Sequence, residues 1–308
     1  MDVNVIYNSE CRLGLKCLPE NSVNCCITSP PYYGLRDYGN DEQIGLEATP
    51  EEYIGKLVEV FREVRRVLTN DGTLWVNIGD SYAGSMKGAA QFPDNAMNYK
   101  QGTNRGALGK ATLVKQCTNC KPKDLIGIPW MLAFALRADG WYLRQDIIWS
   151  KPNPMPESVR DRCTKSHEYI FLLSKSRLYY FDADAIKVPA RESTMRRIRQ
   201  DVDNQVGSSR TLKANGNMKA VIGGRKRNFS DMTEDDPMYR ASTNREYEYT
   251  DKANKRSVWV VSTSAFHGAH FAVFPPALIV DCIKAGCPED GVVLDPFMGS
   301  GTTAIVSR

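Results

Sequence analysis

The sequence has 308 residues, of which 42% are hydrophobic and 25% are charged. This is the composition of an ordinary folded protein, so a disordered or low-complexity chain is excluded. No stretch approaches the roughly 18 apolar residues of a membrane span. The N-terminal stretch also lacks a basic region followed by an apolar run, so no secretory signal is predicted. We therefore expect a cytoplasmic protein.

The net charge of +4 is unevenly distributed along the chain. Residues 191–256 contain 15 Lys and Arg against 10 Asp and Glu, so this polar segment carries the whole positive excess. Such an asymmetry indicates a polyanionic partner.

Nine cysteines are scattered through the chain, several of them within apolar segments. An odd, scattered set is typical of reduced thiols in a cytosolic protein. Cys117 and Cys120 have the spacing of a zinc knuckle, which leaves a structural zinc as an alternative. No second pair follows them, however, so free thiols in a loop are the favoured interpretation and no metal site is predicted.

Hydrophobic periodicity and turn residues predict the secondary structure in chain order. The predicted helix that begins at Pro50 has Thr49 as its N-cap, and Asn70, Asp71 and Gly72 follow its end. The predicted strands are residues 3–7, 23–28, 73–78, 141–149, 167–173 and 291–295, and the predicted helices are residues 50–68, 124–138 and 275–285.

Strands that alternate with helices predict an α/β fold, doubly wound, with a mostly parallel sheet. Residues 83–123 and 191–256 show no clean period. Structureless runs of this length inside a domain are usually functional loops, inserted modules or disorder.

Two stretches carry the chemistry. TSPPY, residues 28–32, leaves a buried strand through two prolines, which cannot continue a sheet ladder. DPFMGSGTT, residues 295–303, places an acidic residue after a strand and glycines before a helix, which predicts a loop that cradles a ligand. The acidic side chain would repel a phosphate but would attract the ammonium of an amino-acid-like cofactor.

Together these stretches resemble motifs IV and I of the amino-group DNA methyltransferases that use S-adenosylmethionine, and their order resembles the β class. Further segments match in order: GTLWVNIGD (72–80), DIIWSKPNPMPES (146–158), HEYIFLLSKS (167–176) and HFAVFPPALI (270–279). The resemblance covers nearly the whole chain outside the two irregular segments. It implies a Rossmann-like methyltransferase sheet with an inserted target-recognition region.

The resemblance also implies a catalytic site at residues 29–32. The Ser29 hydroxyl and the Pro30 carbonyl would accept hydrogen bonds from the exocyclic amine of a flipped base, with Pro30 and Pro31 fixing the carbonyl's direction. Tyr32 would stack on that base. Serine before Pro-Pro-Tyr favours N4 of cytosine, and N6 of adenine stays an alternative. The chain has no Pro-Cys step, so methylation of cytosine carbon 5 is set aside.

By the same resemblance, S-adenosylmethionine is the cofactor. Asp295 would meet its amino group, Phe297 would pack on the adenosyl portion, and Glu10 would lie near the adenine. The other residues implied are Phe274 and Pro275 at the methionine end, for which a role in the core is the alternative, and Gly299, Ser300, Gly301, Thr302 and Thr303 in the loop.

The expected organisation is a catalytic half (1–190), a target-recognition insert (191–256) and a cofactor-binding half (257–308). Double-stranded DNA is the expected partner, and a homodimer and a cognate restriction endonuclease are open possibilities. The expected DNA contacts are Lys151, Asn153, Arg196, Arg197, Arg199, Arg225, Lys226 and Arg227.

The chain ends at Arg308, early in the helix after the cofactor loop. Members of the family usually continue into another strand that carries an acidic residue for the ribose. We therefore expect weakened cofactor binding, and a catalytically impaired DNA-binding remnant is the alternative to an active enzyme.

Overall fold

The computed structural model describes residues 2–35, 40, 42–83, 119–198, 251–263 and 274–308. The chain divides into two compact units, one formed by Met1–Ile186 with Arg256–Arg308 and the other by Lys187–Lys255. Among the described residues, no helix combines the length and the apolar character that crossing a bilayer requires.

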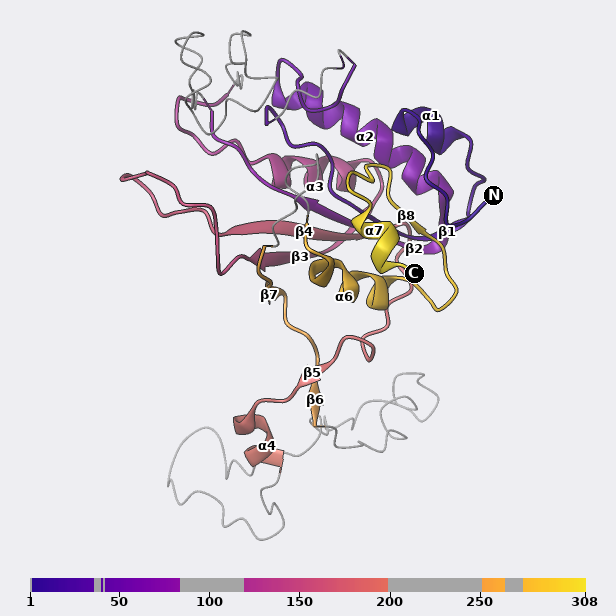
Figure 1. Ribbon diagram of the computed structural model, residues 1–308, viewed down its shortest axis with the longest axis vertical. Coiled ribbons are helices and arrows are strands. Elements are labelled where there is room, and N and C mark those ends of the chain that lie inside the picture. The colour runs from indigo at the N-terminus through magenta and orange to yellow at the C-terminus, as the bar shows by residue number, and fades with distance from the viewer. Residues whose placement is uncertain (1, 36–39, 41, 84–118, 199–250, 264–273) are drawn as a thin grey trace, which may run out of the picture. The chain divides into compact units, whose positions relative to one another are not determined.

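A six-stranded sheet forms the centre of the first unit, with the strand order β7-β3-β4-β2-β1-β8 (Figure 1). Strand β4 runs antiparallel to both of its neighbours, and the other strands are parallel to one another. The mostly parallel α/β sheet predicted from the sequence is confirmed. The strands are β1 (Val23–Thr28), β2 (Leu68–Ile78), β3 (Tyr142–Ser150), β4 (His167–Ser174), β7 (Val258–Val260) and β8 (Val293–Leu294).

Helices cover both faces of this sheet. Figure 1 shows α2 (Pro50–Val67) and α3 (Ile128–Ala138) on one side and α6 (Pro276–Gly286) on the other. Successive side chains of β1 alternate between the two cores: Cys26 packs with the buried face of α2 and α3, whereas Cys25 and Ile27 pack with α6. The helices on both faces of the sheet make the fold doubly wound.

Helix α2 begins where the sequence predicts. The Thr49 Oγ1 atom accepts a hydrogen bond from the backbone amide of Glu52 at 3.2 Å, and Pro50 occupies the first turn. The helix buries one face, which includes Tyr53 and Phe61. Capping and periodicity are local properties, so the prediction needed no long-range information.

The boundary between α2 and β2 differs from the prediction. Strand β2 begins at Leu68, directly after the helix, and includes Asn70, Asp71 and Gly72, which were predicted to end the helix ahead of a strand at residues 73–78. Val23 of β1 pairs with Leu68 and then Cys25 pairs with Thr73, so the extra residues are accommodated as an irregularity in the ladder.

The predicted strand at residues 3–7 is wrong. These residues belong to no strand, and Val3, Val5, Ile6 and Tyr7 are between 47% and 67% exposed. Asn4 has a left-handed backbone with φ +60°, which interrupts an extended run. A strand also needs a hydrogen-bonded partner, and among the described residues none pairs with this segment. The chain then enters α1 (Cys11–Lys16).

The second unit is described only near its two ends. Strands β5 (Val188–Pro189) and β6 (Lys252–Ala253) pair antiparallel, and α4 (Glu192–Ile198) follows β5. The role of this unit in target recognition stays a prediction.

Candidate active site

The candidate site lies at the edge of the sheet where the parallel strands end and the antiparallel β4 begins. In open α/β sheets, ligands bind outside the carboxyl ends of the strands. Ser29 follows β1, Asp295 follows β8, and Glu168 is the second residue of β4. The topology therefore brings together side chains that are far apart in the sequence.

The Ser-Pro-Pro-Tyr segment is held by α2 and by the loop that precedes it. The Tyr53 hydroxyl of α2 donates a hydrogen bond to the Pro31 carbonyl at 2.8 Å. A Cβ added at Gly45 would lie 3.2 Å from the Tyr32 carbonyl oxygen, so this glycine permits a close approach of two backbone segments. These contacts fix the turn after β1, and the predicted roles of Ser29 and Pro30 toward an amine stay predictions.

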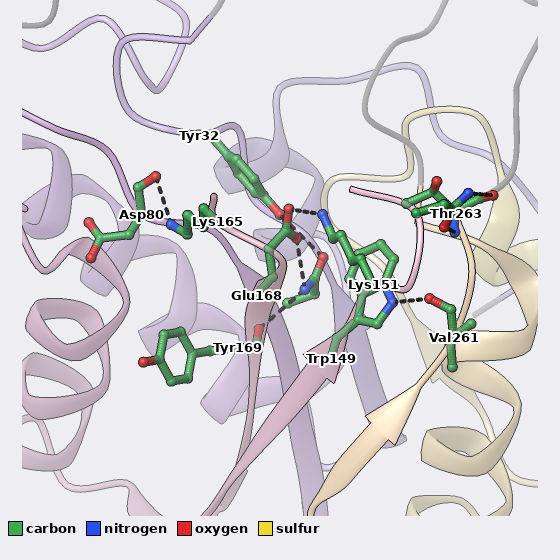
Figure 2. Close-up of polar contacts among 11 residues, drawn as sticks. Tyr32, Asp80, Trp149, Lys151, Lys165, Glu168, Tyr169, Val261 and Thr263 are labelled. Atoms are coloured by element: carbon green, nitrogen blue, oxygen red, sulfur yellow. Dashed lines mark hydrogen bonds and ion pairs between the residues drawn. The ribbon is translucent and has the colours of Figure 1, made fainter. Parts of the chain in front are cut away.

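Tyr32 points toward Glu168, which pairs with Lys151 (Figure 2), and Asn77 completes this polar cluster. Its hydroxyl donates to Glu168 Oε2 at 2.7 Å and lies 3.3 Å from Asn77 Oδ1. Burial, followed by the negative charge of Glu168, raises the pKa of Tyr32 well above its ordinary value. The phenol therefore stays protonated at neutral pH and remains a hydrogen-bond donor.

Asp295 organises the loop after β8. Its Oδ1 atom accepts hydrogen bonds from the Thr28 hydroxyl at 2.6 Å and from the Phe297 amide at 3.0 Å, and its Oδ2 atom accepts from the Thr303 hydroxyl at 2.7 Å. Burial raises the pKa of this carboxyl, and the hydrogen bonds partly offset that effect. A buried carboxylate that has only neutral donors as partners is a suitable counter-charge for a bound cation.

The glycines of the loop are required by its backbone. Gly299 and Gly301 have φ values of +54° and +84°, in the left-handed region, and a Cβ added at Gly301 would meet no atom within 4 Å. Gly301 directly precedes α7 (Thr302–Val306). Open space beside a buried carboxylate and a helix start fits the predicted cofactor with an ammonium and a carboxylate at one end.

Glu10 and Asp295 contribute to the lining of one cavity beside β8, of about 590 Å³. Glu10 is the N-cap of α1, and its Oε2 atom accepts from the Leu13 amide at 3.0 Å. Burial acts to raise the pKa of Glu10, but hydrogen bonds from Arg12 and from Leu13 outweigh it and hold the pKa below its ordinary value. Glu10 is thus an ionised side chain on the wall of a cavity that also reaches the loop after β8.

The other predicted cofactor residues lie at different depths. Phe297 is partly buried against the core under α2 and α3, and Phe274 is buried in the opposite core with Leu278. Pro275 is the N-cap of α6. Phe274 thus packs in the core, which was the alternative to its predicted role. In the loop, Thr302 and Thr303 are buried and the Ser300 and Thr302 hydroxyl oxygens lie 3.2 Å apart.

The predicted DNA contacts are only partly described. Lys151 forms an ion pair with Glu168, and Asn153 exchanges hydrogen bonds with the backbone of Thr263, at 3.0 and 3.4 Å. Arg196 is exposed on α4. Arg197 lies on the same helix, but its side chain is not described, and Arg199, Arg225, Lys226 and Arg227 lie outside the described residues, as does Cys117. Cys120 is disulfide-bonded, so its interpretation as a free thiol is wrong. Where the chain is described, no group of three or more His, Cys, Asp or Glu side chains could hold a metal ion.

Two acidic residues of this edge were not identified from the sequence. Besides Glu168, Asp80 accepts hydrogen bonds through its Oδ1 atom from the amides of Gly127 and Ile128, both at 3.0 Å. Asp80, in the segment that follows β2, thereby caps α3, which begins at Ile128 and not at the predicted residue 124. Both residues lie within segments that matched the family, but only the three-dimensional structure shows their partners.

Comparisons with known proteins agree with this geometry. A family model described as DNA methylase matches residues 23–308. The type II methyltransferase M.SmaI of Serratia marcescens is 43% identical over 307 residues, covering 98% of this chain and 82% of that protein. M.Cfr9I of Citrobacter freundii is also 43% identical, over 98% of this chain and 79% of its own length.

Among solved structures, a PvuII DNA methyltransferase described as cytosine-N4-specific shares the fold, with a TM-score of 0.56 and 16% identity. The likeness covers 98% of this chain and 76% of the other. The family model and the type II relatives thus identify the class of protein as a DNA methyltransferase of the amino-group type. The chain belongs to the N6/N4 DNA methylase family.

Proposed function

We propose that this protein transfers a methyl group from S-adenosylmethionine to the exocyclic amine of a base flipped out of double-stranded DNA. One observation carries the proposal: the Thr28 hydroxyl donates to Asp295 Oδ1 at 2.6 Å. This bond joins the residue before Ser29 to the first residue of the cofactor loop. An amine held at Ser29 and a methyl donor held at Asp295 would therefore be neighbours.

The bound cofactor supplies an electrophilic methyl group on a sulfonium. The exocyclic amine is a weak nucleophile because its lone pair is delocalised into the ring. The Ser29 hydroxyl and the Pro30 carbonyl accept hydrogen bonds from the amine, localise its lone pair and can receive the proton that it releases. Tyr32 offers an aromatic face to the flipped base.

The residues present fit the cofactor. Asp295 provides a buried negative charge for its ammonium, and the loop of Gly299, Ser300, Gly301, Thr302 and Thr303 provides space and backbone amides. Glu10 lines the same cavity as Asp295 and would accept hydrogen bonds from the cofactor's other end. Phe297 would provide an apolar contact. The buried position of Phe274 supports a direct contact less well.

The favoured target is N4 of cytosine, because serine precedes Pro-Pro-Tyr, and N6 of adenine is the alternative. Asn153 and Arg196, together with the basic residues beyond α4, would contact the DNA backbone or base edges. The insert at residues 191–256 would contribute target recognition.

The test is incubation with mixed-sequence duplex DNA and isotope-labelled S-adenosylmethionine, followed by mass spectrometry of the nucleosides. We expect label in N4-methylcytosine. Label in N6-methyladenine would instead support the alternative target within the same reaction.

Ser29→Ala tests whether the label depends on the proposed site. We expect this substitution to lower the rate of methyl transfer about a hundredfold or more, since it removes a hydroxyl that would accept the proton released by the amine. Absence of label in both nucleosides with Ser29 intact would contradict an active enzyme and favour the DNA-binding remnant. Calorimetry with S-adenosylmethionine would then show whether the protein is inactive because the loop after β8 does not bind the cofactor.

A further inference from the structure

Glu168 is the centre of the polar cluster at the candidate site. Its Oε2 atom accepts from the Tyr32 hydroxyl at 2.7 Å and from the Asn77 side-chain amide at 3.3 Å, while its Oε1 atom pairs with the Lys151 ammonium (Figure 2). Both carboxylate oxygens thus have partners, which lie on β2 and in the segments that follow β1 and β3. Glu168 reaches them because β4 is antiparallel, which places the start of that strand at the edge where β1, β2 and β3 end.

The ion pair is largely removed from water. The side chains of Glu168 and Lys151 are only 15% and 17% exposed, and the Lys151 ammonium also lies 4.2 Å from the centre of the Trp149 ring. A pair this buried loses much of its Coulombic gain to desolvation, so it is weak support for stability. Its position beside Tyr32 suggests a role in the site.

Tyr32 is restrained at both its oxygen and its ring. Glu168 holds the phenolic oxygen, and a Cβ added at Gly79 would lie 2.7 Å from the Tyr32 Cε2 atom, so the end of β2 closes against the ring. Two restraints at different points of a planar side chain define its orientation.

We propose that Glu168 is a positioning residue, which holds the Tyr32 ring in the orientation that stacks on the flipped base. Lys151 serves as its counter-charge and not as a DNA contact. The inference rests on the proposed function, because it concerns how the flipped base is held. If the phenol loses its acceptor, the ring gains freedom that it must lose again on stacking, which weakens binding of the flipped base.

The first test is a double-mutant cycle of Glu168→Ala and Tyr32→Phe, on a duplex that carries the sequence methylated by the wild-type protein. We expect each single variant to lower kcat/KM for DNA by about tenfold to a hundredfold, the size of one hydrogen bond to a charged group. The kcat/KM of the double variant should be within about threefold of that of the less active single variant, because the two substitutions remove the same hydrogen bond. A fluorescent analogue of the target base should report a smaller flipped population in all three variants.

The second test concerns the charges. In Glu168→Gln the side-chain oxygen can still accept from Tyr32, but Lys151 loses its counter-charge. We expect the unpaired Lys151 to lower kcat/KM for DNA in Glu168→Gln, and Lys151→Met to restore most of it. The kcat/KM of the double variant Glu168→Gln with Lys151→Met should then be within about threefold of the wild-type value. If the double variant instead binds DNA weakly, with a salt dependence reduced by about one phosphate contact, Lys151 is a DNA contact and its assignment as a counter-charge fails.

Glu157→Ala is the matched control, since Glu157 forms a partly exposed ion pair with Arg162 in the β3–β4 connection. We expect it to change the fluorescence and kcat/KM by about twofold or less. The KM for S-adenosylmethionine and the unfolding temperature of each variant separate positioning from misfolding.

The positioning role is overturned if the effects of Glu168→Ala and Tyr32→Phe multiply, or if either change has no effect on an active wild-type protein. No methylation by the wild-type protein would instead contradict the proposed function itself.

Discussion

At the scale of single residues, Asp295 organises the loop after β8, and in the proposed function it also binds the cofactor's ammonium. Its carboxylate is 8% exposed and accepts hydrogen bonds from Thr28, Phe297 and Thr303. Burial raises its pKa, so the ionised form is less favourable in the folded chain than in the unfolded one. The ionised Asp295 therefore lowers the free energy of unfolding at neutral pH, while it keeps a negative charge in the loop after β8.

Asp295→Asn tests that balance. The amide oxygen can accept from Thr28 and Phe297, and the Thr303 hydroxyl can turn to accept from the new amide, so we expect the folded state to survive. Since the pKa is raised in the folded protein, the wild-type chain loses relative stability as pH rises through that pKa. The stability of the variant relative to wild type should therefore be greater at neutral pH than below the ordinary pKa of aspartate. Thermal unfolding across pH measures this difference.

The same variant should bind S-adenosylmethionine at least about tenfold more weakly in calorimetry, because the counter-charge to its ammonium is gone. Asp139→Asn is the matched control, since it removes a carboxylate from the exposed ion pair with Arg62. We expect it to leave cofactor affinity unchanged. Equal affinity of Asp295→Asn and wild type would contradict the assigned role of Asp295.

At the scale of elements, α2 shows how local sequence sets a boundary. The Thr49 side chain caps the Glu52 amide, and the helix presents a continuous buried face to the sheet and to α3. The end of α2 is set differently, because the pairing of β1 with Leu68 draws the chain into β2 one residue after the helix. One end is therefore predictable from the sequence and the other depends on the sheet.

Thr49→Ala should lower the free energy of unfolding by about 1 kcal/mol, the usual cost of losing an N-cap side chain. Thr69→Ala is the matched control. Among the described residues the buried Thr69 hydroxyl has no hydrogen-bond partner, so its removal should be neutral or slightly stabilising. Denaturant unfolding of both variants checks the prediction, and an equal loss in the two would argue against the capping bond.

At the scale of the molecule, α6 is packed against the sheet through a glycine. The Trp75 indole donates to the Thr73 hydroxyl at 3.1 Å, which donates to the Gly286 carbonyl at 3.0 Å. A Cβ added at Gly286 would lie 2.4 Å from the Trp75 Nε1 atom. The end of α6 can thus approach the sheet only because it has no side chain.

Gly286→Ala should cost about 1–3 kcal/mol of unfolding free energy, because either α6 or the Trp75 side chain must move. Gly55→Ala makes the same chemical change on α2, where an added Cβ would meet no atom within 4 Å. We expect the control to be stabilised by about 0.5–1 kcal/mol through helix propensity. A stabilised Gly286→Ala variant in chemical denaturation would contradict the packing described here.

Local sequence patterns were enough to predict the α/β alternation, the cap of α2, and the two stretches that follow β1 and β8. Each is a pattern of periodicity, capping or turn chemistry, which acts over a few residues. The folded chain was needed to show that residues 3–7 form no strand, that Asp80 caps α3, and that Glu168 holds Tyr32. The last two features depend on partners more than 40 residues away in the chain. A strand, a cap or a buried carboxylate is stable only when the fold brings a hydrogen-bonding partner to it, and local sequence does not specify that partner.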